Sequence, residues 1–148
     1  MMMTDRRGFA VRELAWEQGS QALSTVRKAV FIDEQGVPEA LEWDGRDADA
    51  WHLLAEDADG RPIGAVRLLD DGRIGRMAVL SSWRGRGVGR ALLDEVLRLA
   101  RRQGMMSVYL DAQVTAIRFY QRRGFCAYGE IFPDAGIPHR RMKRELER

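Results

Sequence analysis

Apolar and polar residues alternate over residues 9–16, a pattern typical of a half-buried strand. Gly19-Ser20 then predicts the end of this strand and the N-cap of a helix. Apolar residues follow near helical spacing, so we predict a helix over 20–34 with one side packed on a sheet. Residues 35–50 contain Pro, Gly and several acidic residues, and they predict an acid-rich connection.

Three apolar runs in the middle of the chain predict strands, because hairpin-type turn sequences separate them. The runs are 51–56, 63–69 and 73–80, and the turns are 57–60 and 70–72. An apolar stripe from Val88 to Ala100 then predicts a helix that closes near Gly104. The last predicted elements are a strand at 107–112, a helix at 115–123, and strands at 125–132 and 139–146 joined across 133–138. This order predicts an α+β fold, with a mixed, mostly antiparallel sheet flanked by helices on both faces.

Length and composition fit one ordinary domain spanning residues 1–148, which is large enough to bury about two thirds of its unfolded surface. Cys126 is the single cysteine, so no intramolecular disulfide can form. No long apolar run follows the first residues, and we therefore expect no secretory signal, no membrane span and a cytoplasmic protein. The formal net charge of +2 is too small to argue for a nucleic-acid or membrane partner.

The segment Arg84-Gly85-Arg86-Gly87-Val88-Gly89-Arg90 lies between an apolar strand-like run and a helical run. Glycine lets the backbone turn tightly, and the first amides of a helix have no intrahelical acceptor, so this segment predicts a phosphate site. A plain connection is the alternative. A dinucleotide motif would follow the first strand, a Walker loop would end in Gly-Lys-Ser/Thr, and an RNA-binding arginine-glycine segment would be repeated. None of these patterns occurs.

Arg84-x-x-Gly87-x-Gly89, after a strand and before a helix, resembles the acyl-coenzyme A (CoA) motif of the GCN5-related N-acetyltransferase (GNAT) superfamily. Residues 116–125 resemble that family's helix that carries a tyrosine and ends in Gly-Phe. Their order and their spacing across the strand 107–113 strengthen the match, which covers about residues 51 to 131. The resemblance implies the fold predicted above, with acetyl-CoA as acyl donor and no metal.

A narrower resemblance, to the ElaA-like subgroup, lies in the first third of the chain and near its end. It rests on Arg27-x-x-Val30-Phe31-x-x-Glu34-Gln35-x-Val37-Pro38, Glu42-x-Asp44, Asp47, Trp51-His52-Leu53 and Gly136-Ile137-x-His139-x-x-Met142. A similar arrangement occurs in acyl-homoserine lactone synthases, which share the fold but lack a clear Gly-rich motif. They are the weaker alternative.

The resemblance also implies a role for each matching residue. Backbone amides of Arg86, Gly87, Val88, Gly89, Arg90 and Ala91 would hold the pyrophosphate, with charge-assisted bonds from Arg84, Arg86 and Arg90. Met77 and Val79 would pair through their backbones with the pantetheine arm, and Gln113 stands where many relatives have asparagine. Tyr120 would protonate the departing thiolate, although it could be a core aromatic.

The general base is left open among Glu34, His52 and His139, or a water linked to them, because strand 73–80 has no glutamate. Each could equally be structural. We favour direct transfer over an acyl-cysteine, since no feature around Cys126 lowers a thiol pKa. The acidic connection could attract a small amine or a protein lysine, or be solvated. A non-catalytic acyl-CoA-binding module is the rival function, and the protein could be a monomer or a homodimer.

Overall fold

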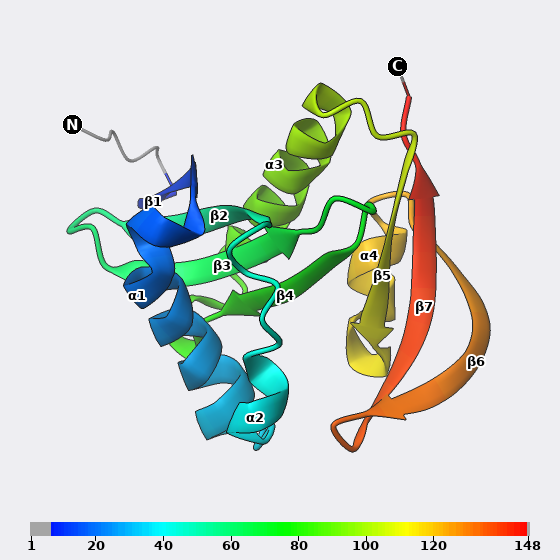
Figure 1. Cartoon of the computed structure of the whole chain (residues 1–148), viewed down its shortest axis with the longest axis horizontal. Coiled ribbons are helices and arrows are strands. Elements are labelled where there is room, and N and C mark those ends of the chain that lie inside the picture. Colours follow the sequence, from blue (N-terminus) through cyan, green and yellow to red (C-terminus); the bar gives the residue numbers. More distant parts are fainter. Residues whose placement is uncertain (1–6, 148) are drawn as a thin grey trace.

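Figure 1 shows the computed structural model, which describes residues 7–147. Its elements are β1 (Phe9–Leu14), α1 (Trp16–Arg27), the π-helical turn η1 (Lys28–Glu34), α2 (Glu39–Glu42), β2 (Trp51–Asp57), β3 (Pro62–Leu68), β4 (Ile74–Val79), the 3-10 turn η2 (Ser81–Trp83), α3 (Val88–Arg102), β5 (Ser107–Gln113), the 3-10 turn η3 (Val114–Ala116), α4 (Ile117–Gln121), β6 (Cys126–Asp134) and β7 (Ile137–Glu145).

The strands form two antiparallel sheets, β1-β2-β3-β4 and β5-β7-β6. A parallel bridge between Arg73 and Tyr109 joins them, and the Tyr109 amide donates to the Gly72 carbonyl at 3.1 Å. Within residues 7–147 no other bridge pairs β4 with β5. Beyond this bridge β4 and β5, which run parallel to each other, diverge (Figure 1). The predicted fold class, mixed and mostly antiparallel with helices on both faces, is confirmed.

Helices cover the first sheet on both faces because its strands alternate their buried side chains. On one face, Leu54, Ala65 and Ala78 pack with Leu23, Val26 and Val30 of α1 and η1. On the other face, Leu53, Val66 and Leu68 pack with Leu92, Leu93 and Val96 of α3. Gly64 permits the close approach of α3, because a Cβ there would lie 2.9 Å from Val88 Cγ1. Phe119 and Tyr120 of α4 pack against the α3 side of the core.

Three predicted boundaries were wrong. Gly19-Ser20 does not cap the first helix, which begins at Trp16 and runs through both residues. Gly19 is instead buried where α1 meets β1, and a Cβ there would lie 1.9 Å from Leu14 Cδ1. The predicted connection 35–50 contains the short helix α2. The connection predicted at 133–138 is reduced to a tight turn, in which Ala135 (φ 52°) and Gly136 (φ 77°) have the left-handed conformation of a hairpin turn.

Candidate active site

The Gly-rich segment forms an open cradle at the start of α3. Gly85 (φ 74°) and Gly87 (φ 87°) adopt conformations that favour glycine, and a Cβ on either would meet no atom within 4 Å. Gly87 is the N-cap of α3, and its carbonyl accepts the Ala91 amide at 3.0 Å. The first amides of α3 therefore face open space with the positive end of the helix dipole, which suits a diphosphate.

The edge of β4 that faces β5 offers backbone groups to a ligand. The Leu80 amide donates to the Ile63 carbonyl at 2.9 Å, so the neighbouring pair of Val79 and Gly64 is a non-hydrogen-bonded one. The amide and carbonyl of Val79 consequently point away from β3, toward β5; the carbonyl accepts a hydrogen bond from Arg84 Nε at 3.1 Å, so the amide is the group that faces a ligand. A bulge precedes this position, where Arg76 has a φ of 52°.

Tyr120 lies beside this edge. Its hydroxyl is 3.9 Å from the sulfur of Met77, and its ring makes edge contacts with Phe119 and Phe125 at centroid distances of 5.0 and 5.9 Å. Desolvation raises the pKa of Tyr120 to about 12. The structure thus brings together Met77 and Tyr120, two of the predicted site residues, and it keeps the phenol protonated at neutral pH.

The three arginines of the motif differ in their surroundings. Both guanidinium Nη atoms of Arg84 bind the Glu34 carboxylate at 2.6 Å, and its Nε donates to the Val79 carbonyl at 3.1 Å. The hydrogen bond to Arg84 lowers the pKa of Glu34. Arg86 stacks over the ring of Trp83 at 3.7 Å, and Arg90 is exposed, with no ion pair to any residue of the described chain. Glu34 and Arg84 therefore meet as partners, which the sequence did not indicate.

Gln113 is also paired across the divergence of the sheets. Its side-chain amide donates to the Gln35 side-chain oxygen at 2.9 Å. Glu34 and Gln35 together connect the cradle to the end of β5, because Glu34 binds Arg84 of the cradle and Gln35 binds Gln113 of β5. The segment that follows α1 is in this way fixed at the open ends of β4 and β5.

His139 lies opposite Gln113 in the β5–β7 pairing, so both side chains share one face of the second sheet. Its Nδ1 is 2.6 Å from the Ile137 carbonyl oxygen, and its ring stacks on Phe132 at 6.1 Å. A carbonyl can only accept, which assigns the proton of the neutral ring to Nδ1. The lone pair is then on Nε2.

His52 is placed elsewhere, on the α1 face of β2. It is buried against Trp16 at 5.2 Å, and its Nε2 is 2.9 Å from the Asp47 carbonyl oxygen. Desolvation lowers the pKa of His52. The structure separates His52 from the cradle and joins it to a buried group of charges.

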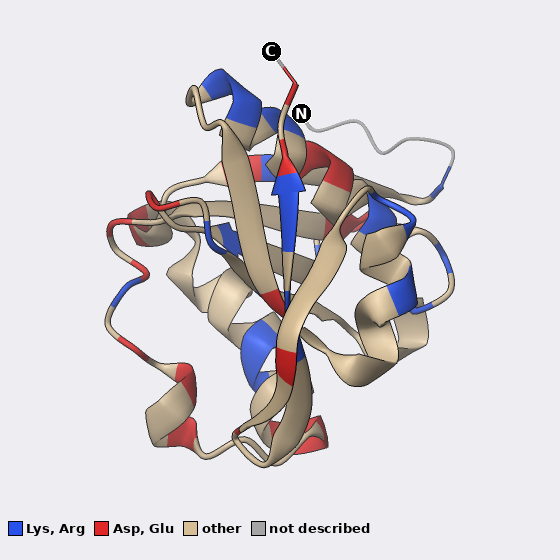
Figure 2. Ribbon diagram, turned by 90° about the vertical axis from the view of Figure 1, so that its right-hand side faces the viewer, with Lys and Arg blue, Asp and Glu red and all other residues tan. Residues whose placement is uncertain are grey.

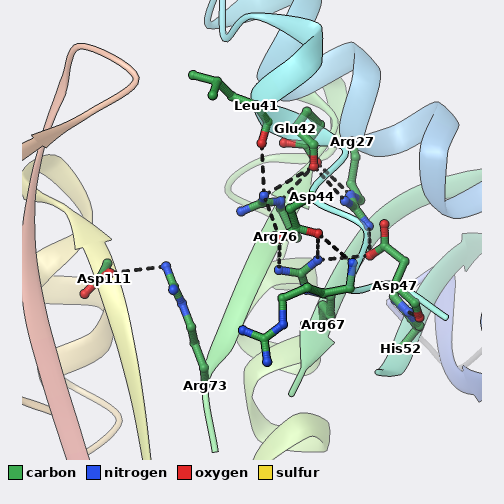
Figure 3. Close-up of polar contacts among 11 residues, drawn as sticks. Arg27, Leu41, Glu42, Asp44, Asp47, His52, Arg67, Arg73, Arg76 and Asp111 are labelled. Atoms are coloured by element: carbon green, nitrogen blue, oxygen red, sulfur yellow. Dashed lines mark hydrogen bonds and ion pairs between the residues drawn. The ribbon is translucent and has the colours of Figure 1, made fainter. Parts of the chain in front are cut away.

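That group, the buried charge cluster, consists of Arg27, Glu42, Asp44, Asp47, Arg67 and Arg76 (Figure 3). Arg27 binds Glu42 and Asp47, each at 2.7 Å. Arg67 binds Asp44 at 2.9 Å, and Arg76 donates to the Leu41 and Glu42 carbonyls at 3.3 and 3.2 Å. These arginines hold α2 and the following loop on the sheet.

The cluster changes the interpretation of the acidic connection. Desolvation would raise the pKa of Asp47, but hydrogen bonds and the charges of Arg27 and Arg67 outweigh it and lower the pKa. For Glu42 desolvation is stronger than the arginines, and its pKa is raised. Glu42, Asp44 and Asp47, which belong to the acidic connection that could attract an amine, are thus bound by arginines of the protein itself. In the sequence, the only sign of these ion pairs is the spacing of the carboxylates from Arg27, and spacing alone does not specify which residues pair.

Comparison with known proteins agrees with the geometry of the cradle. Residues 17–146 match the family model described as an acetyltransferase (GNAT) domain. The chain belongs to the GNAT acetyltransferase family. It is 35% identical to the protein ElaA of Escherichia coli over 133 residues, covering 84% of this chain and 86% of that protein. It is 36% identical to the N-acetyltransferase YjcF of Bacillus subtilis over 124 residues, covering 81% and 88%.

Solved structures extend the same result. An acyl-CoA N-acyltransferase from Pseudomonas aeruginosa is 34% identical, with a TM-score of 0.83 and coverage of 92% of this chain and 99% of that one. Escherichia coli ElaA gives a TM-score of 0.82 at 32% identity, with coverage of 93% and 99%. The GNAT and ElaA-like resemblances are confirmed, and the protein is an acyltransferase of the acyl-CoA-dependent type. Across residues 7–147, no helix combines the length and apolar character that a membrane span requires.

Proposed function

We propose that this GNAT protein transfers an acetyl group from acetyl-CoA directly to a primary amine, either of a small molecule or of a protein lysine. The observation that carries the proposal is the arrangement along β4. The glycine cradle follows the strand, Val79 turns its backbone groups outward at its end, and Tyr120 contacts Met77 two residues earlier. A diphosphate site, a backbone edge and a proton donor thus lie in the order in which CoA carries its diphosphate, pantetheine arm and thioester.

The residues would divide the reaction among them. The amides at the start of α3 hold the diphosphate, and the Val79 backbone binds the pantetheine arm. Tyr120 gives its hydroxyl proton to the leaving sulfur as the carbon–sulfur bond breaks and the carbon–nitrogen bond forms. Among residues 7–147 the Tyr120 hydroxyl has only the Met77 sulfur as a hydrogen-bond partner, so no carboxylate or base of the described chain competes for this proton.

Among the three candidate bases, the geometry favours His139. Glu34 is bound by both Nη atoms of Arg84, and the Nε2 of His52 is directed at a backbone carbonyl inside the protein. The Nε2 of His139 keeps its lone pair and lies on the sheet face of Gln113, near the open end of β5. We therefore assign His139 as the general base, which takes the proton of the attacking amine directly or through one water.

Calorimetric titration with acetyl-CoA tests the cofactor assignment. Gly87→Glu should abolish binding, because it strains a positive φ and places a carboxylate in the cradle. Gly60→Glu is the matched control, since Gly60 has a φ of 79° and open surroundings in the β2–β3 turn. Equal binding by wild type and Gly87→Glu would contradict the assignment.

An assay for released CoA thiol on a panel of amines then separates the enzyme from its rival. A non-catalytic acyl-CoA-binding module would bind acetyl-CoA in the same way but release no thiol with any amine. The position of Tyr120 beside β4 favours the enzyme, because a module that only binds has no need for a proton donor there.

A further inference from the structure

A basic groove of about 370 Å³ lies between α3 and the segment that follows α4. Its charged lining consists of Asp94, Arg98, Arg101, Arg122, Arg123 and Arg144. Five arginines line the groove against Asp94, and Arg98 also pairs with Glu95 beside it, which leaves a formal charge of +3 in a chain that carries +2 overall. Figure 2 shows the basic segment at the C-terminal end of α3, and this segment forms one end of the groove. The charge of the protein is therefore strongly concentrated here.

Part of the groove is fixed by contacts within the protein. Arg123 pairs with Asp94 at 3.5 Å, and Arg144 donates to the Arg123 carbonyl at 2.5 Å. Gly124 lies beneath Arg144, because a Cβ on it would be 3.2 Å from the Arg144 Nε. Two half-buried guanidinium groups are thus held in place before any ligand arrives.

Two further arginines have no counter-charge. The guanidinium groups of Arg101 and Arg122 make no ion pair or hydrogen bond with any residue between 7 and 147, and both side chains are exposed on the groove wall. Like charges that line one groove repel one another, and a bound anion would offset that repulsion.

We propose that this groove binds a small ligand through a diphosphate group. A guanidinium fork binds phosphate oxygens in bidentate fashion, and several forks around one hollow match a multiply charged anion better than a single carboxylate. None of the residues that line the groove is aromatic, so it offers no surface on which a base could stack. It recognises the phosphates, whether they belong to free pyrophosphate or to a nucleotide.

The groove is separate from the cofactor cradle. The cradle lies at Gly87 and the first turn of α3, whereas the groove extends from Asp94 to Arg101, about 10 to 20 Å further along the helix axis. The inference does not depend on the proposed acetyl transfer, and the two sites can be tested independently.

Titration with inorganic pyrophosphate at low ionic strength tests the proposal, in wild type and in the Gly87→Glu background that lacks the cradle. Arg101→Gln combined with Arg122→Gln should weaken binding at least tenfold, because both unpaired charges are removed. Arg102→Gln is the matched control, since Arg102 is the next residue and pairs outside the groove with Glu13 at 3.3 Å. No binding to wild type, or the same affinity in the double variant, would overturn the proposal.

Two comparisons complete the design. Acetyl-CoA should bind the double variant as it binds wild type; a tenfold loss there would assign the groove to CoA and refute a separate site. AMP should bind much more weakly than pyrophosphate or ADP, and equal binding of AMP would refute recognition of a diphosphate. Tighter binding of ADP than of pyrophosphate would identify a nucleotide as the source, and tighter binding of pyrophosphate would identify the free anion.

Discussion

Arg27→Met should destabilise the protein strongly, because Arg27 belongs to the buried charge cluster. Its side chain is 1% exposed, and those of Glu42 and Asp47 are 3% and 8% exposed. Removing one member of a buried ion pair costs about 3–5 kcal/mol, since the partner charge stays buried. Glu42 would keep Arg76 at 3.3 Å, and Asp47 would keep Arg67 at 3.1 Å. We therefore expect a loss near the lower end, about 3 kcal/mol.

Thermal unfolding followed by circular dichroism measures this loss. In a domain of this size each kcal/mol lowers Tm by about 2–4 °C, so Arg27→Met should melt roughly 6–12 °C below wild type. Lys28→Met is the control from the neighbouring position. Lys28 pairs with Asp33 in a bridge whose side chains are 56% and 57% exposed, and such pairs contribute less than about 1 kcal/mol. If both variants melt within about 2 °C of each other, the reasoning about burial is refuted.

Three further predictions concern the site. Tyr120→Phe should lower kcat while leaving acetyl-CoA affinity nearly unchanged, and an unchanged kcat would remove Tyr120 as proton donor. Because the pKa of Tyr120 is about 12, deprotonation of the phenol should not limit wild-type kcat near neutral or mildly alkaline pH. His139→Gln should lower kcat by about 10²–10⁴-fold at unchanged acetyl-CoA affinity, as expected for loss of a general base, and full retention of activity would exclude it. Glu34→Arg and Arg84→Glu should each weaken acetyl-CoA binding and the combined swap should restore part of it, by up to about fivefold; no recovery would mean that Arg84 acts on the cofactor directly.

Local patterns predicted the cradle and the helix after it well. The three glycines, the preceding apolar strand and the stripe from Val88 to Ala100 lie within one short stretch of sequence, and each carries its own conformational preference. The strand predicted at 107–112 is also present as β5, in which the alternate residues Val108, Leu110 and Ala112 are buried. Where neighbours along the chain determine the structure, the sequence was sufficient.

Contacts between distant segments were missed. Glu34 and Arg84 are 50 residues apart, and Gln35 and Gln113 are 78 apart, so no periodicity links them. Gly19 was misread for a related reason. A glycine that breaks a helix and a glycine that admits a neighbouring strand look identical in sequence, and they are distinguished by the structure, in which a Cβ on Gly19 would lie 1.9 Å from Leu14 Cδ1.

The proposed mechanism needs a proton donor for the leaving sulfur and a lone pair for the attacking amine, and the two faces of the sheet offer one group each. Tyr120 lies on the α3 and α4 side, where desolvation raises its pKa to about 12 and preserves its proton. His139 lies on the sheet face of Gln113, which reaches the segment after α1, and the Ile137 carbonyl fixes its lone pair on Nε2. The divergence of β4 from β5 separates the two groups, so neither neutralises the other, and a thioester between the strands could meet an amine from one face and a proton from the other.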